Sequence, residues 1–265
     1  MWGKVQQLVY YTRHSQSSRI YGRIVVLICT LNFIFLVVTE RVGFSRVFIP
    51  RPELAAFLSA NSEGHIAAIL LIWLFPIIYY GYVGKTAATA NSVKYRQMST
   101  GIATWNRWFW LDVASAFTFC FLIVGALLSV DYLLTKFVFL HGEFAYGLDE
   151  FAVHFKNGLA VEMKNPTLTY IVCITMTSIA AASFAALMNV ASMLCTREYL
   201  VCPVMFVLWL ALIAQPQGTT TFIQPFTEYS IGTMIQSFVR FELLTLVGVF
   251  GGYVWLRRRW RHEYF

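Results

Sequence analysis

The segment KTAATANSVKYRQMSTGIATWNRWFW, residues 85–110, decides how the rest of the chain is interpreted. It contains four basic residues and no acidic residue, and it joins two long apolar runs at 66–83 and 108–130. Basic residues gather in the cytoplasmic loops of membrane proteins, so a basic connection between runs of membrane length is typical of such a loop. The segment therefore predicts a membrane protein whose chain turns round in the cytoplasm.

Composition excludes an ordinary soluble domain. The chain has 265 residues, of which 58% are hydrophobic and only 12% are charged, and its mean hydropathy is +0.62. Soluble domains carry roughly 25% charged residues, so this chain has too few charges to cover a globule in water. The net charge of +7 does not indicate nucleic-acid binding, because in a membrane protein the location of the positive residues carries the information. The five cysteines lie in or beside apolar runs, which argues against a disulfide framework or a metal cluster.

Six apolar runs predict an all-α, polytopic membrane protein with six transmembrane helices in a single transmembrane domain over residues 1–265. The runs are residues 24–39, 66–83, 108–130, 168–194, 200–214 and 234–256. The fourth run is rich in Ala, Ser and Thr, and such a surface lets another helix pack closely. Residues 1–23 place apolar side chains near helical spacing among four basic ones. They predict an amphipathic helix on the cytoplasmic membrane surface, with a disordered basic tail as the alternative.

The distribution of charge predicts that both termini are cytoplasmic. With that orientation, thirteen of the 20 Lys and Arg residues fall in cytoplasmic pieces and six in external ones. Nine of the 13 acidic residues fall outside. This asymmetry is the one expected when positive residues remain inside. It makes 85–107 a cytoplasmic loop.

Two external connections contain regularly placed or aromatic apolar residues that free loops usually lack. Residues 131–167 place Phe and Leu at spacings of three and four, which predicts an external segment holding one or two interfacial helices. Residues 215–236 are polar but almost uncharged and contain several aromatic residues. This segment is a candidate for a re-entrant hairpin, which membrane proteins tolerate where other spans bury it.

Motifs for catalysis, metal binding and nucleotide binding are missing from the sequence. Glu150 and His154 are four residues apart, but no further ligand accompanies them, so we expect no metal site there. Gly84-Lys85-Thr86 resembles the end of a phosphate-binding loop. That motif needs a glycine where Tyr79 stands and a strand ahead of it, so we reject it. We expect no catalytic residue, no metal and no nucleotide site in this chain.

Polar side chains inside the predicted spans are few, and each is a candidate functional residue because an ionisable group is costly in lipid. Asp112 lies about one turn inside the predicted interface, where a local ion pair with Arg107 is the alternative explanation. The last two candidates fall near the predicted outer boundary, where snorkelling would also explain them. The candidates are Asn32, Asp112, Asn189, Arg240 and Glu242.

Residues 92–119, SVKYRQMSTGIATWNRWFWLDVASAFTF, resemble the second cytoplasmic connection of type-2 ABC exporter permeases. They are most similar to the small Gram-positive group found with bacteriocin, lantibiotic and bacitracin export or immunity systems. Met98 and the pair Gly101-Ile102 depart from the basic cluster typical of that group. The matching positions are Val93, Tyr95, Arg96, Ser99, Trp105, Arg107 and Trp108.

The resemblance implies a coupling helix that docks into a separate ABC ATPase subunit, which would hold the ATP and Mg. The transporter would contain two ATPase chains and two permease chains, the second being another copy or a homologue. It would export a bacteriocin-like peptide, or another hydrophobic or lipid-like compound, from the plasma membrane of a Gram-positive bacterium. An ordinary positive-inside loop is the alternative for 85–107. The residues implied to contact the ATPase are Lys94, Tyr95, Arg96, Trp105 and Arg107.

Two other classes of function compete with this one. A non-transporting immunity, sensor or scaffold protein would bind a peptide at its outer face, without ATP. A membrane enzyme would need paired catalytic residues at one depth of the membrane, and the sequence does not offer them.

Overall fold

The structure of the protein, a computed structural model, describes about two thirds of the chain. The described residues are 49–59, 69–70, 72–77, 102–145, 147–148, 150, 158–195, 198–213, 215, 218–227 and 229–264. Within them the chain is helical, and the only extended pairing is an isolated bridge between Pro50 and Phe144. The predicted all-α class is confirmed.

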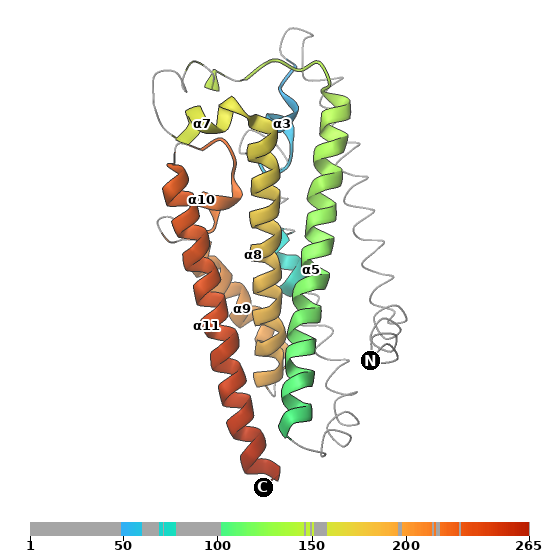
Figure 1. The fold of residues 1–265 in the computed structure, drawn as a ribbon, viewed down its shortest axis with the longest axis vertical. Coiled ribbons are helices and arrows are strands. Elements are labelled where there is room, and N and C mark those ends of the chain that lie inside the picture. The colour runs from blue at the N-terminus through green and yellow to red at the C-terminus, as the bar shows by residue number, and fades with distance from the viewer. Residues whose placement is uncertain are drawn as a thin grey trace.

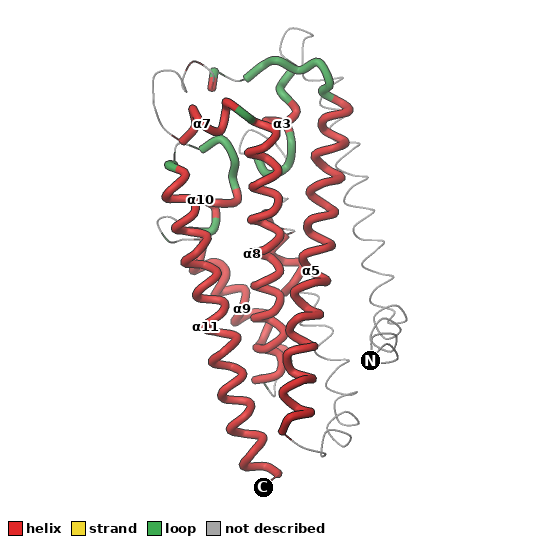
Figure 2. The backbone as a smooth tube through the Cα atoms, in the orientation of Figure 1, coloured by secondary structure: helices red, strands yellow, loops and turns green. Residues whose placement is uncertain are grey.

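Seven helices have described bounds, and Figure 1 labels them. Residues 69–70 and 72–77 are also helical. Three of them, α5, α8 and α11, run the length of the molecule side by side (Figures 1 and 2). The helices are α3 (Pro52–Ala55), α5 (Ile102–Val138), α7 (Gly158–Lys164), α8 (Pro166–Leu194), α9 (Glu198–Ile213), α10 (Thr220–Ile223) and α11 (Ile231–Tyr264).

The three long helices are apolar enough to cross a membrane. The candidate spans are Trp105–Val138, Pro166–Leu194 and Ile231–Arg259. A fourth, shorter apolar helix occupies Leu200–Ile213 within α9. At about 1.5 Å per residue, each candidate span exceeds the roughly 30 Å of a hydrocarbon core. These helices are compatible with a membrane-embedded protein.

Helix α8 forms the centre of the packing. Two thirds of its most apolar window (67%) is buried, against 33% for α5 and 22% for α11. Its small residues Ala180, Ala181, Ala182 and Ala185 are completely buried. The prediction of a close-packing surface on this helix is thus confirmed. Helix α11 packs closely against α8 at Gly252. A Cβ at that position would lie 2.3 Å from Val190 Cγ1, so only glycine fits there without a shift.

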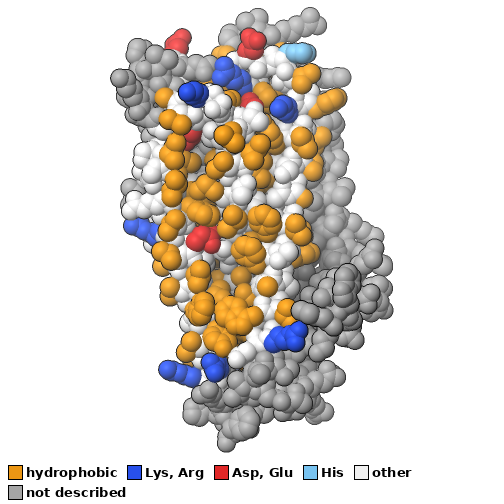
Figure 3. All heavy atoms as spheres, in the orientation of Figure 1, with side chains coloured by type: hydrophobic (Ala, Val, Ile, Leu, Met, Phe, Trp, Pro, Cys, Tyr) orange, Lys and Arg blue, Asp and Glu red, His pale blue; other side chains and the backbone are white. Residues whose placement is uncertain are grey.

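The two ends of the helix bundle differ in what they contain. The loop end carries α3, α7 and α10, and the basic end holds the start of α5 and the last turns of α11 (Figure 1). At the basic end, Arg107, Arg258 and Arg259 are exposed. In Figure 3 the surface between the ends is mostly hydrophobic, and basic side chains reappear at its lower limit.

Helix α5 extends beyond the predicted span 108–130 at both ends. The helix starts at Ile102 and continues to Val138, which takes eight residues from the predicted external segment 131–167. Asp131 looks like the end of a span in the sequence, but it is only 3% exposed. Its carboxylate accepts a hydrogen bond of 3.0 Å from the backbone N–H of Phe57, so the helix continues past it.

The other predicted spans match to different extents. The runs 168–194 and 234–256 lie inside α8 and α11, and 200–214 corresponds to α9. The short helices α7 and α10 fall in the predicted external segments 131–167 and 215–236. The predicted N-terminal helix 1–23, the span 24–39, parts of 66–83 and residues 85–101 of the cytoplasmic loop lie outside the described residues.

Candidate functional site

The basic end contains a stack of aromatic rings that joins α5 to α11. The Trp105 ring stacks on Tyr253 of α11 at 5.8 Å between centroids and on Phe109 at 5.6 Å. The Tyr253 hydroxyl donates a 3.0 Å hydrogen bond to Asn106 Oδ1. Trp110 adds a ring contact to Tyr253 at 5.4 Å. The first turns of α5, which include the end of the predicted docking segment 85–107, are therefore fixed to α11.

Two predicted ATPase contacts lie in this junction with different exposure. Trp105 is only 7% exposed, so most of its surface serves packing within the chain. Arg107, two residues on, is exposed at the surface of the basic end. Lys94, Tyr95 and Arg96 lie outside the described residues.

At the loop end, a buried polar cluster ties the segment 49–59 to the long helices. Glu53 accepts hydrogen bonds at Oε1 from the Tyr132 hydroxyl, at 3.0 Å, and from Thr167, at 2.8 Å. The rings of Tyr132 and Tyr170 stack at 4.7 Å, and the Tyr170 oxygen accepts the backbone N–H of Leu58. These buried groups form hydrogen bonds with one another, so the cluster holds the segment 49–59 against α5 and α8. We call such a cluster a clasp.

A second clasp joins α7 to the segment 218–227. Glu162 of α7 is 3% exposed, and its Oε2 accepts the backbone N–H of Phe226 at 2.5 Å. Burial raises the pKa of the Glu162 carboxyl to about 7, although the amides of Phe226 and Thr227 act to lower it. Of the two amides, only that of Phe226 has hydrogen-bond geometry, and Oε1 accepts none among the described residues. Phe226 itself has a φ of 60°, which is uncommon for a residue with a side chain.

Between the two ends, Glu242 of α11 faces α8. Ser183 donates a 2.6 Å hydrogen bond to Glu242 Oε2, while Oε1 is buried and accepts no hydrogen bond from any described residue. The sequence suggested a place near the end of a span. The helix instead begins at Ile231, about three turns before Glu242, which puts the carboxylate well inside α11.

The remaining intramembrane candidates do not gather into one site. Asp112 and Asn189 are half-buried on α5 and α8, and their backbone oxygens accept hydrogen bonds from Ser115 and Ser192. Arg240 is exposed on α11, and Asn32 lies outside the described residues. No set of three His, Cys, Asp or Glu side chains able to hold a metal occurs in the part of the chain that the structure describes.

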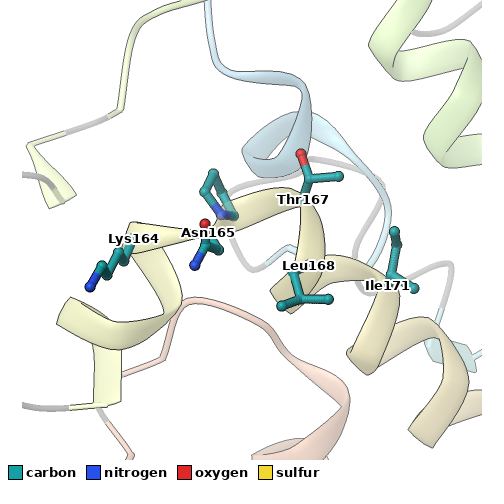
Figure 4. A pocket seen from close by; sticks show the side chains of 6 residues that line it. Lys164, Asn165, Thr167, Leu168 and Ile171 are labelled. Carbon is teal, nitrogen blue, oxygen red and sulfur yellow. The ribbon is translucent and has the colours of Figure 1, made fainter.

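An open groove of about 350 Å³ lies at the corner between α7 and α8 (Figure 4). Its one charged side chain, Lys164, is at one edge, and Leu168 and Ile171 form the apolar side. Thr167 on its rim already bonds to Glu53. The groove therefore resembles an interfacial surface between two helices and lacks the convergent polar groups of a small-molecule site.

Sequence reasoning missed Glu53, Glu162 and Ser183. Acidic residues in a polar connection look solvated, and the groups that donate hydrogen bonds to these two carboxylates are 64 to 114 residues away along the chain. Only Ser183 had a signal, because it lies in the small-residue stretch predicted to pack closely.

Comparison with known proteins gives no family assignment. No family model matches the sequence, and no solved structure matches it. The chain is similar to YybM of Bacillus subtilis strain 168, an uncharacterized protein. The two are 22% identical over 184 residues, which is 69% of this chain and 73% of YybM.

Proposed function

We propose that the chain is the permease subunit of an ABC exporter for a hydrophobic or amphipathic compound, such as a peptide or a lipid-like molecule. In this proposal six spans cross the plasma membrane and both termini are cytoplasmic. A separate ATPase subunit binds ATP and Mg, and it docks on the basic segment 85–107. Two copies of the chain, or one copy and a homologue, complete the transporter.

The observation that supports this proposal best is the aromatic junction at the basic end. A docking segment is useful to a motor only if its displacement reaches the membrane helices. Residues 102–107 are continuous with α5, and Trp105 and Asn106 link them to Tyr253 of α11. A push on this segment would therefore move two long helices together.

The second support is electrostatic. The basic end presents Arg107, Arg258 and Arg259 as exposed cations, with Arg259 lying 5.6 Å over the ring of Trp255. Such a surface is complementary to an acidic groove on a soluble partner, and it also suits anionic lipid headgroups. The charge pattern alone therefore also fits an ordinary cytoplasmic face. The aromatic junction between α5 and α11 is the observation that favours coupling to an ATPase.

The test is co-purification with ATP hydrolysis as the readout. The full chain is isolated from native membranes in mild detergent, and ATP hydrolysis by the purified fraction is measured. We expect Arg96→Glu to reduce this hydrolysis at least tenfold, because it places a negative charge in the docking segment. Lys164→Glu, an exposed charge reversal on α7 at the opposite end of the bundle, is the matched control and should retain it.

Trp105→Asp is a poor test, because it would break the stack with Tyr253 as well as any contact with a partner. Unchanged ATP hydrolysis in Arg96→Glu would refute the docking segment. Protection of cells against a peptide that persists when ATP hydrolysis is blocked would favour the non-transporting alternative.

A further inference from the structure

One side of α11 carries an apolar stripe that the rest of the described chain leaves about half exposed, although Phe250 at one end of the stripe contacts the ring of Trp110. Four of its side chains, spaced by four, three and four residues, are each about half exposed. They are Val239, Leu243, Leu246 and Phe250. The same spacing forms the seam of two-stranded helical coils, in which side chains of one helix fit between those of the other.

Two opposite charges flank this stripe. At about 100° per residue, Arg240 lies about 90° to one side of its middle, and Glu242 about 70° to the other side. Arg240 is exposed, and the structure gives it no ion pair with another described residue. Glu242 is held by Ser183 through Oε2 only. Over α8 and α11, Figure 3 shows an acidic side chain surrounded by hydrophobic ones.

Ionisable residues inside a membrane are costly unless they face protein or water or pair with one another. Snorkelling toward the loop end would relieve Arg240, but it would leave Glu242 Oε1 without a partner. Arg240 and Glu242 cannot relieve each other within one chain, because residues two apart point to nearly opposite sides of a helix. A second α11 helix would solve both problems.

We propose that two copies of this chain associate through the α11 stripe, with Arg240 of each copy paired to Glu242 of the other. Two copies in one membrane have the same orientation, so a two-fold axis along the membrane normal makes their α11 helices parallel. The axis brings the Arg240 flank of one helix onto the same side of the seam as the Glu242 flank of the other. The two residues differ by only about 3 Å in height, which lets the long arginine reach the carboxylate.

Two further features fit this interface. The last torsion of the Glu242 side chain is soft, so a rotation that moves both carboxylate oxygens can offer one of them to the second helix and leave the other in reach of Ser183. Gly251 lies about 110° from the middle of the stripe, on the Arg240 side, and a Cβ there would meet nothing within 4 Å, so that flank is open. The interface is isologous, and each association therefore forms the ion pair twice.

This inference assigns a surface to the second permease copy, and on that point it rests on the proposed function. Its test needs no ATPase, so the two can fail separately. The full chain is co-expressed with two different affinity tags. The fraction of one tagged copy that is captured with the other is then measured after extraction in mild detergent.

Arg240→Glu and Glu242→Arg are each expected to reduce capture at least fivefold, because each leaves like charges facing across the seam. The double variant R240E/E242R should restore capture to within twofold of wild type. The decisive arm co-expresses Arg240→Glu under one tag with Glu242→Arg under the other. Both cross-pairs are then of opposite charge, and capture should return, although neither variant captures itself.

Arg258→Glu on the same helix, outside the stripe, should leave capture unchanged. A variant that had only misfolded would not be rescued by another misfolded variant, so the mixed arm separates misfolding from loss of the ion pair. Capture that all charge variants leave unchanged would place the second copy on another face and overturn the proposal. Absence of capture in wild type, or failure of the mixed pair, would overturn it as well.

Discussion

Glu162 should make the loop end sensitive to pH near neutrality. Its carboxyl is buried between α7 and the segment 218–227, and burial raises its pKa from 4.5 to about 7. A carboxyl whose pKa is higher in the folded state binds a proton more tightly there than in the detached segment. Stability is therefore highest below the unfolded pKa, near 4.5, and it falls as the pH rises through about 7.

The size of the effect follows from the shift. The rise of this pKa from 4.5 to about 7, at 1.36 kcal/mol for each tenfold change in proton affinity, corresponds to about 3 kcal/mol. For a chain of this size, 1 kcal/mol moves the melting temperature by about 2–4 °C. Between pH 4.5 and pH 8 we therefore expect a fall of about 6–12 °C attributable to this one group.

The perturbation is Glu162→Gln. Glutamine keeps the oxygen that accepts the Phe226 N–H but does not ionise, so it should remove the pH dependence without removing the bond. The assay is thermal unfolding of the purified chain from pH 4.5 to 8, together with hydrogen exchange of residues 218–227. The variant should match wild type at pH 4.5 and exceed it by about 6–12 °C at pH 8.

Glu143→Gln is the matched control, since Glu143 is an exposed carboxyl in the connection at the loop end. It should follow the wild-type curve. The reasoning is refuted if Glu162→Gln and wild type lose the same stability between pH 4.5 and 8, or if exchange of residues 218–227 does not change with the melting curve.

Three further substitutions test the packing by thermal unfolding of the purified chain. Trp73→Ala should cost about 3–5 kcal/mol, because the fully buried ring contacts aromatic rings of α8, α9 and α11; a loss below 1 kcal/mol would contradict this. Gly252→Val should cost about 1–3 kcal/mol by forcing α11 away from Val190, whereas Gly232→Ala, whose Cβ would make an ordinary 3.8 Å contact with Ser230 Oγ, should not destabilise. Tyr132→Phe should cost about 1–2 kcal/mol by removing a donor to buried Glu53, and an unchanged melting temperature would show that this clasp contributes nothing.

The long helices were accessible to sequence reasoning because their signal is local. Length and hydropathy indicated α8 and α11, and the small residues of the fourth run indicated the packing surface that Ala181 and Ala185 form. The core of α5 was found in the same way, but its ends were not. Asp131 looked like the start of a loop because nothing nearby in sequence neutralises it.

The contacts that sequence reasoning could not find are those between distant segments. Asp131 is stabilised by the amide of Phe57, 74 residues away, and Glu53 by Thr167, 114 residues away. In the sequence, Glu162 looks like an ordinary carboxylate in a solvated loop. Only the folded structure brings it into contact with Phe226, 64 residues away. Glu242 was recognised as unusual, but its partner Ser183 comes from another helix and required the packing of α8 against α11.

The aromatic junction of Trp105 and Tyr253 has a geometric consequence. Helices α5 and α11 converge at the basic end and diverge toward the loop end, with α8 between them (Figure 1). They form a V whose vertex is the ring stack. An arm of about 50 Å converts each degree of opening at the vertex into about 0.9 Å of separation at the far end. Small rotations at the basic end would thus be magnified into ångström-scale changes at the opposite end of the bundle.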